Sequence, residues 1–230
     1  MPRFPHNSKF DALFEKIPDI VWFPYVGEEF GREQRRLLVL AHNVPVSEEV
    51  YRRRPDMQHR LFWTKTLDEY TYTPGWWTRT FRLFVKGAVG LEQNFTSVSE
   101  TSVQERVDAF VRSIAYINFV QGVVVSERQI TRASLQQIES SKFINGALLS
   151  ILEPTHCICW GSHVFAHLSA MQGYRAGDSR PIGPRGFLSR VLHDAEGRAI
   201  QVLRVYHPSM PRFSALSPST HATIAEFLSN

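Results

Sequence analysis

The sequence predicts an α/β protein: a three-layer α/β/α sandwich around a central, mainly parallel four-stranded sheet. Two observations support this fold class. First, the chain contains short apolar, β-branched runs without polar alternation, as expected for strands buried on both faces of a parallel sheet. Second, helical patterns separate these runs, so strands and helices alternate along the chain. The predicted strands span residues 37–41, 114–120, 156–161 and 200–206.

Helical periodicity fills the intervals between the predicted strands. Ser47 is placed to cap a helix that begins at residue 48. A longer helix is predicted over residues 134–152, and it stops before Pro154 because proline disfavours a helical conformation in the residue before it. Its expected buried positions are Leu135, Ile138, Phe143, Ala147 and Leu148. Shorter helices are expected over 8–19, 102–112 and 163–171, and a loop over 173–186.

Polar residues or glycine follow each predicted strand at its carboxyl end. In a parallel sheet these ends share one edge, and ligands bind in the crevice outside it. The repetition at every strand favours a functional cleft over a set of incidental surface loops. The residues concerned are His42 and Asn43 after the first strand, Asn118 near the end of the second, Gly161 and Ser162 after the third, and His207 and Ser209 after the fourth.

Composition limits the class of protein. With 230 residues, of which 43% are hydrophobic, the chain suits a single domain over residues 1–230. No run approaches the ~18–20 apolar residues of a membrane span, and the N-terminus lacks the apolar core of a signal peptide. We therefore expect a cytoplasmic monomer without a membrane partner. The net charge of +4 is compatible with an anionic partner but does not establish one.

Metal and cofactor sites find no support in the sequence. Cys157 and Cys159 face the same side of one predicted strand and lack the two further ligands that zinc needs, so we interpret them as buried reduced thiols. His163 and His167 have the i, i+4 spacing of a helical metal site, but no acidic ligand accompanies them, and we interpret them as a surface or packing pair. We expect no cofactor and no metal.

The order of these motifs resembles the uracil-DNA glycosylase superfamily, over roughly residues 20–214. His207-Pro208-Ser209 is a near-literal match to the last motif of that superfamily. Asn118 matches the family asparagine that reads a pyrimidine edge. The strand that ends at Gly161 and leads into a helix matches the third element of the pattern.

The first motif of the superfamily is matched in part. It typically reads glycine, any residue, then Asp, Asn or Glu, then proline or alanine, whereas residues 41–45 of this chain read Ala-His-Asn-Val-Pro. Asn43 falls on the position that handles the catalytic water. Ala41, His42 and Val44 depart from the pattern, which leaves the substrate and the activity to be tested.

The resemblance implies a metal-independent, monofunctional DNA glycosylase whose partner is DNA. Such an enzyme flips a nucleotide out of the stack and hydrolyses its N-glycosidic bond. Asn43 would position the water, and His207 would donate to the base oxygen as negative charge grows there. Predicted DNA contacts are Gly161, Ser162 and Ser209 to the flanking phosphates. Arg212 or Phe213, with Met210 and Pro211, is predicted to wedge into the gap left by the flipped base.

Pro45 stands where the strictest uracil-specific members carry a tyrosine that blocks the 5-position of the pyrimidine. An open pocket would admit a 5-substituted pyrimidine, for example a hydroxymethylated or glucosylated base of phage DNA, with His42 as an added polar contact. Phage defence would fit such a substrate. Uracil remains the alternative, since Trp76, Trp77 or Phe81 could close the pocket in place of the tyrosine.

Two alternatives from other classes stay open. The altered first motif is compatible with a non-catalytic relative that binds DNA or a modified base. The α/β fold alone would also suit a small-molecule hydrolase. DNA binding that weakens as salt rises would distinguish the DNA-binding relative from the small-molecule hydrolase. Such a salt dependence arises because counterions are released when a protein contacts phosphates.

Overall fold

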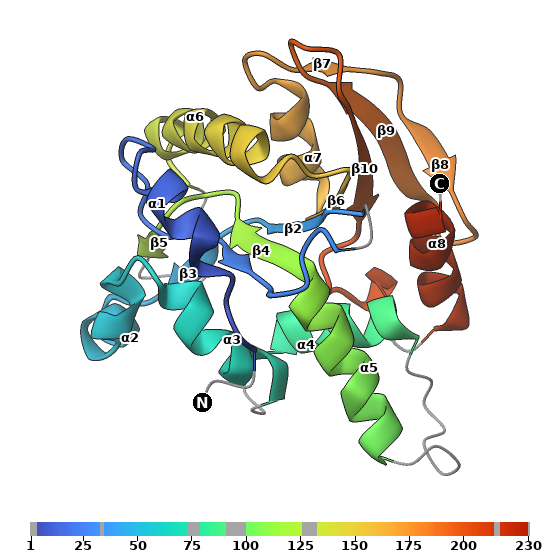
Figure 1. Cartoon of the computed structure of the whole chain (residues 1–230), viewed down its shortest axis with the longest axis horizontal. Coiled ribbons are helices and arrows are strands. Elements are labelled where there is room, and N and C mark those ends of the chain that lie inside the picture. Colours follow the sequence, from blue (N-terminus) through green and yellow to red (C-terminus); the bar gives the residue numbers. More distant parts are fainter. Residues whose placement is uncertain are drawn as a thin grey trace.

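Four parallel strands form the centre of the protein, seen in a computed structural model that describes residues 4–32, 35–72, 79–90, 100–125, 133–213 and 217–229 (Figure 1). All four correspond to strands predicted from apolar runs, and all are buried along most of their length. From one side of the sheet to the other they are β4 (Ile114–Asn118), β2 (Leu37–Ala41), β6 (His156–Trp160) and β10 (Ala199–Val205).

The sheet is larger than predicted and mixed, with eight strands among the described residues instead of four. Antiparallel strands extend both sides of the parallel centre, and they were missed because they are short or have one solvated face. In β9, for example, Arg190 interrupts the apolar pattern. The added strands are β1 (Tyr25–Val26) beside β4, β9 (Phe187–His193) beside β10, and β7 (Arg175–Ala176) and β8 (Arg180–Ile182), both beside β9. The predicted loop over 173–186 therefore contains two strands.

A second, two-stranded sheet lies next to the main one. It joins β3 (Val44–Val46) and β5 (Val123–Val125) in parallel. Each of these strands follows one of the central strands, so the chain continues past the carboxyl edge of the sheet as a paired extension. Neither segment was among the predicted strands.

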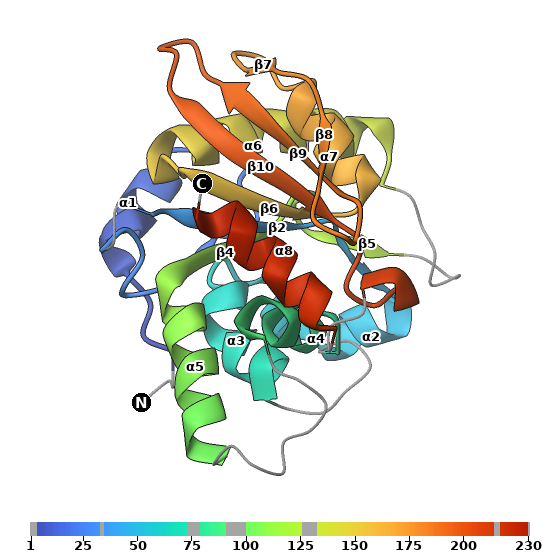
Figure 2. The same ribbon diagram turned by 90° about the vertical axis from the view of Figure 1, so that its right-hand side faces the viewer.

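Helices cover both faces of the main sheet (Figure 2). Helices α6 and α7 lie over one face, and α3, α4, α5 and α8 lie over the other. No described helix is long and apolar enough to cross a membrane. The α-helices are α1 (Asp11–Phe14), α2 (Glu48–Arg53), α3 (Phe62–Tyr72), α4 (Arg79–Val89), α5 (Glu100–Ser113), α6 (Leu135–Leu152), α7 (Ser162–Ser169) and α8 (Pro218–Ser229); the 3₁₀ turns are η1 (Ser8–Phe10), η2 (Pro55–Gln58) and η3 (Pro211–Phe213).

Helix α6 begins and ends where the sequence predicted, but only part of the predicted face is buried. Ile138 and Ala147 are half-buried against the core, as predicted. Ser134 and Gln137 form a capping box at its start, and Glu153 ends it in a left-handed conformation. Leu148 is buried as predicted, whereas Leu135 and Phe143 are 81% and 63% exposed. Buried positions include the polar Ser141 and Asn145, which hydrogen-bond the segment after β4. Polar residues on the buried face hid it from the hydrophobic pattern.

The predicted state of the two cysteines is confirmed. Cys157 and Cys159 are free thiols, both fully buried in β6. Burial raises the pKa of Cys157 to about 12, because a thiolate is poorly solvated in the core. Both are therefore core residues of the sheet.

The two faces of α6 provide a test of this packing. We expect Leu148→Ala to lower the free energy of unfolding by about 2–5 kcal/mol, because it removes buried methyl groups and leaves a cavity. The same substitution at the exposed Leu135 should change it by less than about 0.5 kcal/mol. Urea denaturation of both variants measures the difference. Equal losses would contradict the observed orientation of the helix.

Candidate functional site

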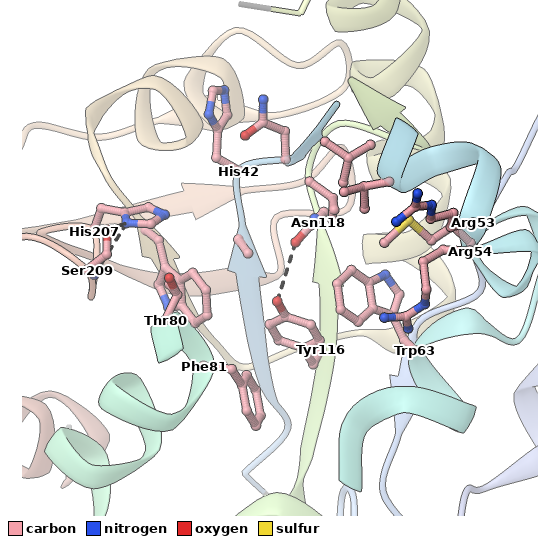
Figure 3. A pocket seen from close by; sticks show the side chains of 17 residues that line it. His42, Arg53, Arg54, Trp63, Thr80, Phe81, Tyr116, Asn118, His207 and Ser209 are labelled. Atoms are coloured by element: carbon pink, nitrogen blue, oxygen red, sulfur yellow. Dashed lines mark hydrogen bonds between the residues drawn. The ribbon is translucent and has the colours of Figure 1, made fainter. Parts of the chain in front are cut away.

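A pocket of about 530 Å³ opens at the carboxyl edge of the parallel strands. It lies where the sequence placed the cleft, and it joins residues that are far apart in the chain (Figure 3). Of the predicted site residues, those that line it are His42, Asn43, Phe81, Asn118, His207 and Ser209.

Backbone pairing of β2 with β4 holds His42 and Asn118 at the same edge of the sheet. The register puts Ala41 opposite Asn118. Beyond the sheet, the Phe119 N–H donates to the Ala41 carbonyl at 2.8 Å and the Val120 N–H donates to the His42 carbonyl at 2.9 Å. The two strand ends are thus hydrogen-bonded together where they enter the pocket, which limits their relative movement.

His207 is oriented by its own motif. The backbone N–H of Ser209 donates to Nδ1 at 3.4 Å, and the Ser209 hydroxyl lies 2.8 Å from the same atom. Because a backbone N–H can only donate, Nδ1 is an acceptor and the ring proton resides on Nε2. Burial lowers the pKa of His207, so the ring is neutral at pH 7. Figure 3 shows Nδ1 facing Ser209 and the opposite edge of the ring facing the pocket, where Nε2–H is a neutral donor.

Asn118 is nearly fully buried, at 1% exposure, and presents an amide to the pocket. The Tyr116 hydroxyl donates to its Oδ1 at 3.4 Å. A phenol can donate or accept, so Tyr116 can support the amide of Asn118 in either orientation. The pair can therefore meet a ligand edge that offers either donors or acceptors.

Asn43 lines the pocket beside the end of β2. Within the described part of the chain its amide has no hydrogen-bond partner, which leaves it available to a water or a ligand. As a neutral amide it can orient a water molecule through hydrogen bonds, but it cannot take a proton efficiently. The described residues of the pocket wall include no carboxylate that would serve as a stronger base.

His42 stacks on His163 from α7, with ring centroids 5.7 Å apart and planes 17° from parallel. Burial, followed by the positive charge that His163, His167 and His207 can carry, lowers the pKa of His42 to about 4. His42 is therefore a neutral polar group in the pocket wall at pH 7. The pairing of His163 with a pocket residue agrees with the packing role predicted for it.

Other predicted site residues lie outside the pocket wall. Gly161 caps α7 with a φ of 88°, a left-handed conformation that favours glycine, and no side chain caps the helix. The backbone N–H groups of its first turn, at Ser162, are thus placed for an anion at the same edge of the sheet. Met210 is 50% exposed and Arg212 is exposed, so both can reach a partner.

The predicted wedge role of Phe213 is wrong. Its ring is fully buried between Phe84 and Phe187, with centroids 6.4 Å from each. It also packs closely on α4, where a Cβ at Gly87 would approach the ring to 3.0 Å. The 3₁₀ turn η3 directs this side chain inward, and Phe213 anchors the loop that carries Met210 and Arg212.

Three of the side chains predicted to shape the pocket, those of Pro45, Trp76 and Trp77, lie outside the described residues. The backbone of Pro45 lies in β3, between the pocket residues Val44 and Val46.

Several pocket residues were missed by the sequence analysis. Tyr116 was predictable in part, because it lies two positions before Asn118 in one strand and so faces the same side. Trp63 packs against Tyr116 with centroids 4.9 Å apart, and Phe81 does so at 4.8 Å. No local pattern distinguished these rings from ordinary core aromatics. The missed residues include Arg53, Arg54, Trp63, Thr80, Tyr116 and Trp160.

Comparison with protein-family models and with curated proteins finds no match for this chain. Among the described residues no three His, Cys, Asp or Glu side chains cluster in a way that could hold a metal ion. The pocket residues themselves are therefore the guide to function.

The histidine stack gives a pH-dependent prediction. We expect the free energy of unfolding to fall as the pH drops from 6.5 toward 4, because unfolded His42 binds a proton in this range and folded His42 does not. His163→Ala should raise the pKa of His42, yet leave it below 6.5, since burial is the larger cause. NMR titration of the His42 ring in both proteins measures this shift. An unchanged pKa would mean that His163 does not contribute to the lowered pKa of His42.

The corrected place of Phe213 gives a second prediction. We expect Phe213→Ala to lower the free energy of unfolding by about 3–5 kcal/mol, because it empties a buried aromatic site. Met210→Ala, three residues earlier on the exposed side of the loop, should cost less than about 0.5 kcal/mol. Thermal and urea unfolding of the two variants compare them. A small loss of unfolding free energy in Phe213→Ala would contradict the buried position of this side chain.

Proposed function

We propose that this protein is a monofunctional DNA glycosylase that flips out a modified, 5-substituted pyrimidine and hydrolyses its N-glycosidic bond. Hydroxymethylated or glucosylated bases of phage DNA are the candidate substrates, and uracil is the alternative. The observation that carries the proposal is the meeting of Asn43, Asn118 and His207 around one pocket at the carboxyl edge of the sheet. These are the residues on which the resemblance to the uracil-DNA glycosylase superfamily rests.

The proposed reaction breaks the bond between the sugar C1′ and the base nitrogen, and the bonding electrons leave with the base. Nε2–H of neutral His207 donates to the base oxygen as negative charge grows there, an interaction stronger in the transition state than in the ground state. Asn43 orients the water whose oxygen bonds to C1′ and whose proton passes to the released base. Neutral His207 suits this role because it donates a hydrogen bond without transferring a proton.

Recognition of the base would fall to Asn118 and the aromatic wall. The flipped base costs about a few kcal/mol of lost stacking, which contacts inside the pocket must offset. Phe81 and Tyr116 supply aromatic surface, and the Asn118 amide supplies the hydrogen bonds. The exposed Met210 would enter the gap in the duplex, and the N-terminal amides of α7 would meet a phosphate.

A non-catalytic reader of modified DNA is the second candidate. The departures from the first motif at Ala41, His42 and Val44 favour it, since these residues surround Asn43. The reader and the enzyme share the same pocket and the same bound base. They differ only in whether the glycosidic bond is cut.

Base release from synthetic duplexes tests the proposal. We expect alkali-labile strand scission with one of four bases, namely uracil, hydroxymethyluracil, hydroxymethylcytosine or glucosylated hydroxymethylcytosine. His207→Ala should slow the reaction by about 10²–10³-fold, as for the loss of one oxyanion donor, and Asn43→Ala should also lose activity. His59→Ala, an exposed histidine outside the pocket wall, is the matched control.

The possible outcomes separate the candidates. Tight binding of a modified duplex without release would establish the reader in place of the enzyme. No binding to any duplex at low salt would contradict both. Equal activity of His207→Ala and wild type would remove His207 from the mechanism.

A further inference from the structure

The pocket extends well beyond the residues that would hold a pyrimidine ring. Its volume of about 530 Å³ falls within the ~300–1,000 Å³ of pockets that enclose drug-sized ligands, more than a single small ring occupies. The additional wall is made by β3, α2 and η2, which contribute Val46, Val50, Arg53, Arg54 and Met57. This part of the pocket has no role in the chemistry proposed above.

The order of the strands gives the pocket a direction. His207 follows β10 at one side of the parallel strands, and Asn118 ends β4 at the other side. Figure 3 shows His207 and Ser209 on one side of the pocket and Arg53, Arg54 and Trp63 on the opposite side, with Asn118 between them. A ligand that touches His207 therefore points its far end toward the two arginines.

Pyrimidine geometry fits this direction. Carbon 2 and carbon 5 are opposite atoms of the six-membered ring. If His207 donates to the oxygen on carbon 2 and Asn118 reads the adjacent edge, a substituent on carbon 5 leaves the ring away from His207. It then enters the part of the pocket that ends at Arg54.

Arg54 is held rigidly at that end by Asp56. Its Nε donates to Oδ1 at 2.9 Å and to Oδ2 at 3.2 Å, and its Nη2 donates to Oδ2 at 2.8 Å. The hydrogen bonds from Arg54 lower the pKa of Asp56, so the carboxylate is ionised and the pair has no net charge. Arg53 is likewise paired, with Glu49 at 2.8 Å. Among the described residues, each of the two arginines at this end of the pocket is thus paired with a carboxylate.

We propose that Arg54, positioned by Asp56, is a specificity-determining residue that favours a neutral, hydroxyl-bearing group on carbon 5 of the pyrimidine over an anionic one. A guanidinium edge donates to hydroxyl oxygens in a fixed direction. The adjacent carboxylate removes the net positive charge that would attract a carboxyl or phosphate group and repels such a group. The inference rests on the proposed function for the placement of the base.

Matched duplexes test the inference, each with one cytosine that is unmodified, 5-hydroxymethylated, 5-glucosylated through the hydroxymethyl group, or 5-carboxylated. We expect Arg54→Ala to lower kcat/KM for the glucosylated base at least about tenfold more than for the hydroxymethylated base, as for a lost hydrogen bond to a charged group. Asp56→Asn should shift preference toward the carboxylated base, and Asp56→Glu should restore the original preference. Arg52→Ala removes the same charge two residues earlier in the chain, at a side chain of α2 outside the pocket wall, and should leave the preference unchanged.

Binding of the same duplexes, measured by fluorescence anisotropy with His207→Ala as the background, separates this inference from the proposed function. If no base is released by any variant, the glycosylase proposal fails, and the binding preference alone decides the role of Arg54. A preference for the glucosylated base that is lost in Arg54→Ala would support it. A wild-type preference for the carboxylated base, or an equal effect of Arg54→Ala and Arg52→Ala, would overturn it.

Discussion

Parallel pairing of β2 between β4 and β6 is the constraint on which the rest of the structure depends. The register places Ala41 opposite Asn118, and β10 joins β6 in the same direction. All four carboxyl ends therefore meet at one edge. Residues separated by more than 150 positions in the chain, such as Asn43 and His207, line the same pocket for this reason.

Aromatic packing under that edge supports the pocket. Tyr116 lies at its centre, in contact with Trp63, Phe81 and Trp160, and Trp160 contacts the edge of His207 with centroids 6.0 Å apart. The rings form an aromatic floor to the pocket. The polar groups of Asn43, Asn118 and His207 lie above this floor. In such surroundings a hydrogen bond to developing charge is worth more than in water, because the local dielectric constant is low.

Local hydrogen bonds then define the chemical state of the pocket. Ser209 assigns the proton of His207 to Nε2, Tyr116 supports the amide of Asn118, and Asp56 fixes the guanidinium of Arg54. The lowered pKa values of His42 and His207 keep both rings neutral at pH 7. The described part of the pocket therefore combines neutral histidine and amide groups with two arginines that are each paired with a carboxylate.

The central strands, the start and end of α6, and the residues Asn43, Asn118, His207 and Ser209 were predictable from the sequence alone. Apolar runs, helix caps and a proline after a strand are local signals, and parallel strands bring their ends together whatever the details of packing. Only the tertiary structure decided the edge strands, the buried face of α6 and the inward position of Phe213. Whether a short segment becomes an edge strand depends on which of its sides faces solvent in the folded protein. The polar Ser141 and Asn145 on the buried face of α6 find their hydrogen-bond partners only after folding. Arg54 enters the pocket because β3 and α2 pack beside β5, a contact between distant segments that no local pattern encodes.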